Sequence, residues 1–416
     1  MIKKIFFLSF LFFSIILTAY IIYKSEIHWN GESRAYYLKY YYISAFFLTL
    51  SLFSFFLSEK IKLYIMIVLI SIISTLYLYE GYIIIKNPVT NDAKPFSMAY
   101  KDSLQSNPNL SLPVFPFYHL NDKNIDYFPL TGQSYADLIY CNENGYYNKF
   151  TSDRYGFNNP DQVWDTNAVK YLIVGDSFAY GNCVNRPDDI SSVLRKLSQK
   201  NVINLGQSGI GPLIKFAILK EFFPKNVENV IWLYYEGNDL GDLKFELKND
   251  FLKKYIIQQD FSQELKKNQN KTDAIVKKLR LELNKSVNKR KISKSIKNFI
   301  KLQKVRNNFF LLTMPVPNND FRKIIKKAKN LSNSRGAKFI FIYLPEFARY
   351  QKNYRNDQYI AVKNIIMDLD IQFIDINDSV FRKLNNPNDL FPLLGKGHYN
   401  EAGYYKTSES IFKSVN

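Results

Sequence analysis

Three long apolar runs fill the first part of the chain. They are Phe6 to Tyr23, Tyr40 to Leu57 and Leu63 to Tyr79. A helix needs about 20 apolar residues to cross a bilayer, and each run is close to that length. Beyond Ile85 no run of this kind recurs. We therefore expect residues 1–86 to be a membrane region with three transmembrane helices.

The charges around these runs indicate their orientation. Basic residues flank the start of the first and third runs, at Lys3, Lys4, Lys60 and Lys62. Basic flanks are typically cytoplasmic, and no small-residue cleavage site follows the first run, so we expect it to be retained. Three retained spans would place everything after residue 86 outside the cytoplasm. The first loop also carries basic residues, Lys24, Arg34 and Lys39, which reduces the difference in charge between the two sides of the membrane.

The pattern changes after the membrane region. Residues 87–165 are rich in Pro, Asn, Asp and Tyr, and we expect a linker and an N-terminal extension of loops and short strands packed on the main domain. From residue 166 to 416, short apolar runs alternate with helical patterns, which predicts an α/β domain with a parallel sheet. The predicted strands are Tyr171 to Val174, Val202 to Leu205, Val230 to Tyr235, Lys338 to Leu344 and Ile371 to Ile374.

A long basic insertion, residues 241–329, separates the third and fourth strands. Its apolar residues recur at three- and four-residue intervals, which predicts a helix, and lysine and arginine fill most other positions. These apolar residues are Val276, Leu279, Leu283, Val287, Ile292, Ile296 and Ile300. The segment could dock on an anionic membrane or polysaccharide. We favour the other interpretation, a packed helix with a solvated basic face.

The net charge and the cysteines indicate which classes of partner and which cellular compartment to expect. The net charge of +19 is accompanied by no nucleic-acid motif, so acidic glycans or anionic lipids are the expected partners rather than nucleic acid. The two cysteines, Cys141 and Cys183, lack metal-ligand spacing. In an oxidising compartment they could form a disulfide, which we favour, or remain two unrelated buried thiols. We expect no metal and no cofactor.

Four short motifs follow predicted strands. They are Val174 to Phe178, Asn204 to Gly209, Glu236 to Asp239 and Gly397 to Asn400. The carboxyl ends of parallel strands meet at one edge of a sheet, where open α/β folds place their sites. The chain has only three histidines, and His28 and His119 lie outside the α/β repeat. His398 is therefore the candidate base for Ser177, because a serine hydroxyl needs a neighbouring imidazole to become a strong nucleophile.

In this order and setting the motifs resemble the four conserved blocks of the SGNH (GDSL-like) hydrolase family. The resemblance covers residues 150 to 416, and Asp153 to Asn158 looks like the segment that often precedes the first block. It implies a parallel-sheet SGNH-hydrolase-like sandwich with Ser177 as nucleophile and His398 as general base. The backbone N–H groups of Ser177 and Gly209 and the side chain of Asn238 would then form the oxyanion hole.

Two positions depart from the family pattern. Glu236 stands where the third block usually has glycine, and Gly395 and Lys396 stand where an aspartate usually precedes the histidine. We expect Asp176, next to the nucleophile, to hold the turn rather than to act as the missing carboxylate. A backbone carbonyl in Leu393 to Lys396 could orient the imidazole instead, which we favour over the alternative, Asp389. Three further carboxylates near the histidine receive no catalytic role, namely Asp375, Asp378 and Glu401.

These residues support acyl transfer through an acyl-serine intermediate, with water or a sugar hydroxyl as acceptor. We expect an exported, membrane-anchored serine esterase that acts on O-acetyl or similar esters of envelope polysaccharide. An O-acetyltransferase of a surface polysaccharide is the close alternative. A non-catalytic glycan-binding protein with the same fold is a third possibility. The expected partners are the lipid bilayer and an acylated glycan.

Overall fold

The computed structural model describes most of the chain in two compact units. The described residues are 2–28, 31, 34–86, 98–107, 109–120, 126–309, 316–351, 354, 356, 358–392 and 397–415, without the side chains of 2–6, 35–36, 283–295 and 307–309. One unit comprises Met1–Pro88 with Asn288–Thr313, and the other comprises Val89–Val287 with Met314–Asn416. The predicted domain boundaries at 86 and 165 stay predictions.

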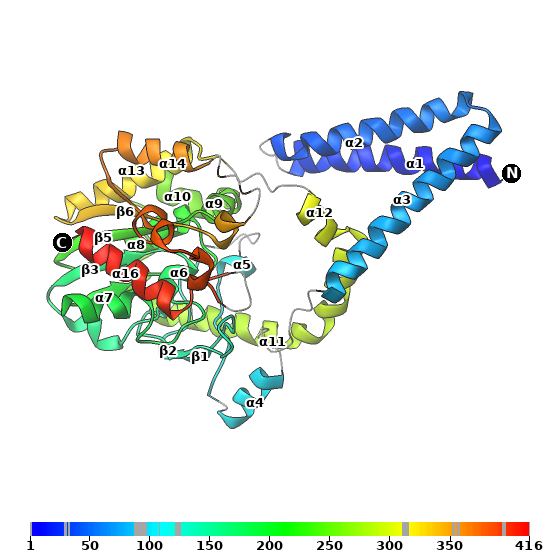
Figure 1. Cartoon of the computed structure of the whole chain (residues 1–416). Helices are drawn as coiled ribbons and strands as arrows, with labels where there is room; N and C mark the ends of the chain where they lie inside the picture. The colour runs from blue at the N-terminus through cyan, green and yellow to red at the C-terminus, as the bar shows by residue number, and fades with distance from the viewer. Residues whose placement is uncertain are drawn as a thin grey trace. The chain divides into compact units, whose positions relative to one another are not determined.

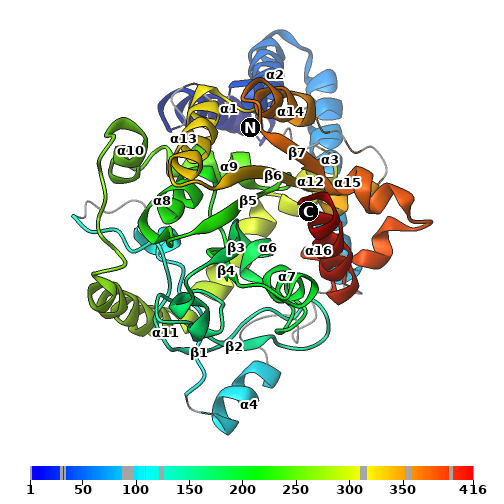
Figure 2. The same ribbon diagram turned by 90° about the vertical axis from the view of Figure 1, so that its left-hand side faces the viewer.

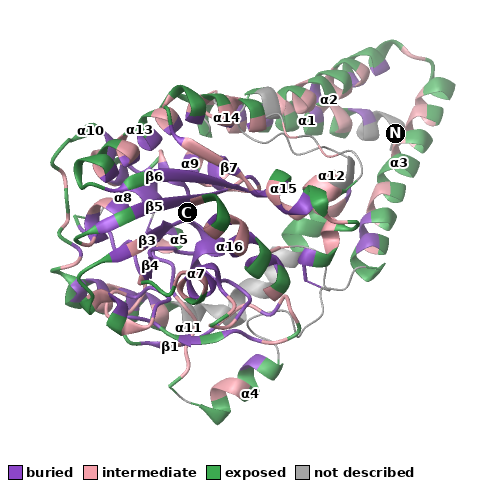
Figure 3. Ribbon diagram, turned by 60° about the vertical axis from the view of Figure 1, so that its left-hand side comes forward, coloured by how far each residue is buried: buried purple, intermediate pink, exposed green. Residues whose placement is uncertain are grey.

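The first unit contains three helices long and apolar enough to cross a membrane, as predicted. They are α1 (Ile2–Ile22), α2 (Arg34–Phe53) and α3 (Glu59–Lys86), with a π-helical turn at Tyr23–His28 and a 3₁₀ turn at Ser54–Phe56. Large apolar side chains are exposed along all three helices (Figure 3). Such exposure is unfavourable in water and favourable in lipid. The same unit holds α12 (Gln303–Phe309).

The second unit is built on a five-stranded sheet in which every pairing is parallel. Its strands lie in the order β4 (Val202–Asn204), β3 (Val169–Val174), β5 (Val227–Tyr235), β6 (Lys338–Leu344) and β7 (Gln372–Asp375). Each lies within a few residues of a predicted strand, because buried parallel strands are nearly continuous apolar runs. The predicted fold class, an α/β parallel sheet preceded by three apolar helices, is confirmed.

Helices cover both faces of the sheet (Figure 2). Alternate side chains of β3 point to opposite faces, so Leu172 and Val174 enter one core while Tyr171 and Ile173 enter the other. The first face carries α8 (Pro212–Phe222), α10 (Asp250–Ile257), α13 (Asn319–Ser334) and α14 (Gln358–Asp368). The second carries α6 (Ser177–Tyr180), α7 (Ile190–Ser198), α15 (Ile376–Ser379) and α16 (Glu401–Val415).

The N-terminal extension is part of the same core. It contains α4 (Met98–Ser106), α5 (Phe117–Leu120) and an antiparallel pair, β1 (Asp137–Ile139) with β2 (Lys149–Thr151). Phe117 and Phe128 are buried in the cluster that also holds β3 and α8. Among its described residues the unit also has 3₁₀ turns at Asp161–Asp165, Phe347–Tyr350, Phe381–Lys383 and Pro387–Leu390.

The basic insertion is helical, as predicted, but its two ends differ. It forms α9 (Asp239–Glu246), α10 and the long α11 (Gln269–Ile300). Val276 and Leu279 are buried in the core of the second unit, which agrees with a packed helix. The side chains of Leu283, Val287 and Ile292 lie outside the described residues. Ile296 and Ile300, which belong to the first unit, are exposed.

Candidate active site

The candidate nucleophile lies at the turn between β3 and α6. Ser177 is the first residue of α6 and is only 7% exposed. Asp176 caps this helix, because its Oδ1 accepts a hydrogen bond from the Phe178 N–H at 3.0 Å. This agrees with the structural role expected for Asp176. At the other end of α6, Asn158 Nδ2 donates to the Tyr180 carbonyl at 2.8 Å, so the extension supports the turn.

His398 lies against the serine. Its Nε2 is 2.8 Å from Ser177 Oγ, which is hydrogen-bonding distance. The Phe178 ring packs beside the imidazole, with its centroid 5.0 Å from that of His398, and also contacts Tyr399. The structure thus brings together the two residues predicted as base and nucleophile, although 221 positions separate them in the chain.

A carboxylate from the extension occupies the other side of the imidazole. Glu143 Oε2 is 3.1 Å from His398 Nδ1 and accepts the His398 backbone N–H at 2.8 Å. Of the two predicted substitutes for the missing aspartate, Asp389 is described and lies elsewhere, and the other is not tested. Asp389 is exposed and accepts a hydrogen bond from Asn386, and Leu393 to Lys396 lie outside the described residues.

Gly397 makes the approach of this carboxylate possible. Its φ of +119° is one that residues with a side chain rarely adopt. A Cβ added here would lie 2.3 Å from Glu143 Oε2. The glycine beside the histidine therefore has two functions, a backbone turn and space for the carboxylate.

The charge on Glu143 determines the state of the histidine ring. Burial alone would raise the pKa of Glu143, but the hydrogen bond and the charge of the His398 ring, with the His398 backbone N–H, together lower it. An ionised Glu143 accepts a hydrogen bond from the Nδ1–H of His398, which keeps the proton on Nδ1 and leaves the lone pair of Nε2 for the Ser177 hydroxyl. The three side chains form a hydrogen-bonded chain of the kind that activates serine nucleophiles.

A disulfide holds the extension at the site. Cys141 and Cys183 are bonded, with Cα atoms 4.8 Å apart, and Asn144 Nδ2 donates to the Cys183 carbonyl at 3.0 Å. Cys183 Sγ is 3.3 Å from His398 Nδ1. The two sulfurs, the Glu143 carboxylate and Nδ1 lie within 4.8 Å of one another. Because the sulfurs bond each other and the carboxylate pairs with the ring, this group is not arranged as a metal site.

The predicted oxyanion donors follow neighbouring strands. Gly209 lies in the loop after β4 with φ +75°, where an added Cβ would meet Tyr118 Oη at 1.9 Å. Asn238 directly precedes α9, and its Oδ1 is buried without a hydrogen-bond partner among the described residues. Both therefore lie at the carboxyl edge of the sheet, as Ser177 does. Their roles as donors, and that of the Ser177 N–H, stay predictions.

Glu236, the other departure from the family pattern, has a structural environment. Its carboxylate is buried, forms an ion pair with Arg349 and accepts the Glu346 N–H at 2.8 Å. Where the family pattern has glycine, this chain has a glutamate that links the end of β5 to the segment after β6, two positions before Asn238.

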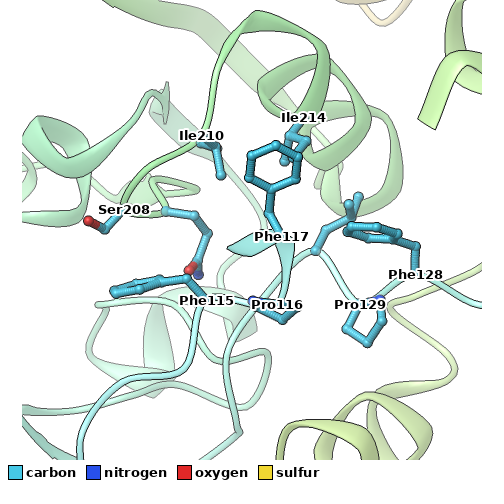
Figure 4. Close-up of a pocket in the computed structure, with 10 residues that line it drawn as sticks. Phe115, Pro116, Phe117, Phe128, Pro129, Ser208, Ile210 and Ile214 are labelled. Atoms are coloured by element: carbon cyan, nitrogen blue, oxygen red, sulfur yellow. The ribbon is translucent and has the colours of Figure 1, made fainter. Parts of the chain in front are cut away.

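A small apolar pocket lies beside the loop after β4, and neither Ser177 nor His398 lines it (Figure 4). Its cavity volume is ≈ 10 Å³, about enough for one water molecule. The walls come from the extension, the loop after β4 and α8, and they comprise Phe115, Pro116, Phe117, Phe128, Pro129, Leu130, Gln207, Ser208, Ile210 and Ile214. The pocket has no room for a long acyl chain.

Comparison with known proteins gives matches only among solved structures, since no family model and no curated protein matches. One is a G-D-S-L family protein from Desulfitobacterium hafniense, with 15% identity and a TM-score of 0.33, covering 59% of this chain and 98% of that one. Another is a psychrotrophic esterase from Pseudoalteromonas, with 11% identity and a TM-score of 0.31, covering 60% and 97%. A third is an acetyl xylan esterase, with 12% identity and a TM-score of 0.34, covering 60% and 100%. Many of the matching structures are GDSL or SGNH hydrolases, the family that the four sequence motifs resemble.

Proposed function

We propose that this protein is a membrane-anchored serine esterase that acts on O-acetyl or similar short acyl esters, among them those of envelope polysaccharide. One observation supports this most strongly. Ser177 Oγ, the His398 ring and the Glu143 carboxylate form a continuous chain with contacts of 2.8 and 3.1 Å. A structural serine and a surface histidine would not need a carboxylate held behind the ring.

The chain of contacts supports a two-step reaction. Ser177 Oγ attacks the ester carbonyl while His398 Nε2 takes the hydroxyl proton, and Glu143 stabilises the imidazolium that forms. The tetrahedral intermediate breaks its bond to the alcohol, which leaves with that proton. A water molecule, deprotonated by His398, then attacks the acyl-serine and releases the acid. Gly209, Asn238 and the Ser177 N–H are the proposed donors to the oxyanion.

The proposed acyl group is acetyl or a similar short chain, as expected from the sequence. The net charge of +19 favours an acidic glycan as the carrier of the ester. A sugar hydroxyl in place of water in the second step would make the protein an O-acetyltransferase, and the same residues support that reaction.

The proposed location is outside the cytoplasm, with the bilayer as an obligate partner. Three candidate spans support a cytoplasmic N-terminus and an exported catalytic domain. The Cys141–Cys183 disulfide supports the same side, because disulfides persist in oxidising compartments.

The test is the reaction of the full chain with a fluorophosphonate probe, followed by turnover of an acetyl ester with and without a polysaccharide acceptor. We expect wild-type protein to be labelled, and Ser177→Ala to lose labelling and about 10³-fold or more of its activity. Ser410→Ala is the matched control, since Ser410 lies on α16 and bonds Ser379. Failure of the wild type to react would leave a glycan-binding protein, and full turnover by Ser177→Ala would exclude this nucleophile.

A further inference from the structure

The far end of the basic insertion contacts the third candidate span. Tyr77 Oη in α3 donates to the Ile300 carbonyl at 2.9 Å, and the Tyr77 and Phe299 rings lie with centroids 5.4 Å apart. The two segments are more than 200 positions apart in the chain and belong to one compact unit. Figure 1 shows α12 and the end of α11 beside α3.

A buried carboxylate fixes this contact. Glu80, on α3, is 1% exposed and accepts the backbone N–H groups of Lys304 and Val305 at 3.0 and 2.8 Å. These donors lie in the first turn of α12, where helices have unpaired N–H groups. Arg306, one residue on, donates to Tyr40 Oη of α2 at 2.9 Å. A glutamate at the end of an apolar span is costly unless it is paired, and here two backbone donors satisfy it.

The contact lies near the end of α3, where we expect the membrane interface. α3 is a candidate span from Glu59 to Lys86, and Tyr77 and Glu80 lie within its last three turns, where the helix approaches the membrane interface. Tyr77, Tyr79 and Tyr82 are the type of residue found at headgroup level. The far end of the insertion therefore contacts α3 near the end of this candidate span.

The returning segment is amphipathic, and its apolar side stays exposed apart from the contact of Phe299 with Tyr77. Ile296, Phe299 and Ile300 are 54, 38 and 61% exposed, and their spacing places them on one helix face. Lys297, between Ile296 and Phe299, and Lys301, directly after Ile300, are exposed. Residues 296–306 therefore have three properties: an exposed apolar face, adjacent lysines, and contacts that hold them near the end of a candidate span.

We propose that residues 296–306 are a second membrane anchor, which lies in the bilayer interface with Ile296, Phe299 and Ile300 among the upper acyl chains and its lysines toward lipid phosphates. The occupant of this face is the same lipid that surrounds α3, since the apolar surface of the segment is continuous with that span. The anchor is independent of the esterase proposal and requires only that α3 cross a bilayer.

The experiment places a nitroxide on the segment in the full chain, reconstituted in phosphatidylethanolamine and phosphatidylglycerol bilayers. Ile296→Cys and Ile300→Cys each provide one reactive thiol, because both native cysteines are in the disulfide. Ile73→Cys, at a site 53% exposed in the middle of α3, is the lipid reference. Leu281→Cys, at a site 57% exposed on α11 in the second unit, is the water reference.

We expect the labels at Ile296 and Ile300 to collide with oxygen more often than the label at Leu281 but less often than the label at Ile73, because the interface lies above the centre of the bilayer. Their accessibility to a nickel chelate should be several-fold lower than that of the label at Leu281. Nickel accessibility equal to that at Leu281 would show a water-exposed helix and overturn the anchor. Shielding from both oxygen and nickel would also overturn it, because the face would then be covered by protein.

Discussion

His398 has a different oxygen atom at each ring nitrogen, and the chemistry of the site depends on both. The Ser177 hydroxyl lies at Nε2 and the Glu143 carboxylate at Nδ1. The second contact selects the tautomer, and the negative charge stabilises the imidazolium during reaction. Glu143 also holds the backbone of His398, so it positions the ring in two ways.

Replacing Glu143 with Gln should lower kcat/KM by about 10³-fold or more while the protein stays folded, since an amide cannot supply the charge and can favour the wrong tautomer. Steady-state kinetics on an acetyl ester give the measurement. Asp389→Asn, at an exposed carboxylate near the histidine in sequence, is the control and should cost less than about tenfold. The reverse ranking would restore Asp389 as the orienting group.

The same pair makes a pH prediction. The pKa of Glu143 is lowered from 4.5 in the folded protein, so its charge contributes stability that is present above that ordinary value. This contribution is lost as the pH falls through the lowered pKa. The difference in Tm between wild type and Glu143→Gln should therefore shrink as the pH falls below about 4.5. A difference that does not depend on pH would contradict an ionised Glu143.

Gly397→Ala should damage the site more than the fold. The added Cβ would overlap Glu143 Oε2, so the carboxylate must move, and we expect activity to fall by about 10²-fold. Gly336→Ala is a matched control, because its φ is +77° and no heavy atom lies within 4 Å of the added Cβ. Both variants should lose about 1–3 kcal/mol of stability from backbone strain, but only Gly397→Ala should lose catalysis.

Ser177 could be found from sequence because it closely follows a predicted strand, and His398 because it is the only histidine within the α/β repeat. Glu143 could not be found this way, since it lies in a loop-rich segment without periodicity, and no local pattern marks it. The one available signal was indirect. If Cys141 pairs with Cys183, then residues near Cys141 must lie near the nucleophile turn, which makes Glu143 a candidate for the missing carboxylate.

Among the elements, the disulfide connects the extension to the loop after the nucleophile. On the chain-entropy model a bridge with a sequence separation of 42 stabilises the fold by at most about 4 kcal/mol. Its position adds a local effect, because Cys141 is two residues before Glu143 and Cys183 Sγ is 3.3 Å from the imidazole. Loss of the bridge should loosen the carboxylate as well as the fold.

A double-mutant cycle separates these two effects. We expect Cys141→Ala with Cys183→Ala to lower kcat/KM by about tenfold well below Tm, and to cost little more activity in the Glu143→Gln background. Equal losses in both backgrounds would show that the bridge acts on the fold alone. Mass spectrometry of protein purified without reductant should find no free thiol.

The elements themselves were predictable to different degrees. β3, β4, β5 and β6 could be recognised because most of their residues are buried and form nearly continuous apolar runs, while the edge strand β7 is only partly buried. The interpretation of the insertion as one packed helix was right for Val276 and Leu279 but not for Ile296 and Ile300. Periodicity identifies an apolar face, but it cannot show whether that face meets a protein core or lies uncovered beside a membrane span.

At the scale of the whole molecule, three candidate spans precede a catalytic unit that carries a disulfide. An odd number of spans places the two ends of the chain on opposite sides of the membrane. A phosphatase fused after Asn416 should be active and an ordinary green fluorescent protein in its place should be dark. The opposite pattern would mean that one of the three helices does not cross.

The extension also changes what counts as the smallest working enzyme. A chain trimmed to the sheet and its helices, beginning at residue 166, would keep Ser177 and His398 and all five parallel strands. It would lack Glu143, half of the disulfide, and the aromatic residues Phe117 and Phe128 that close the core beneath α8. Such a fragment would keep the parallel sheet but lack the carboxylate that orients His398. The proposed catalytic unit is therefore larger than the parallel sheet with its covering helices.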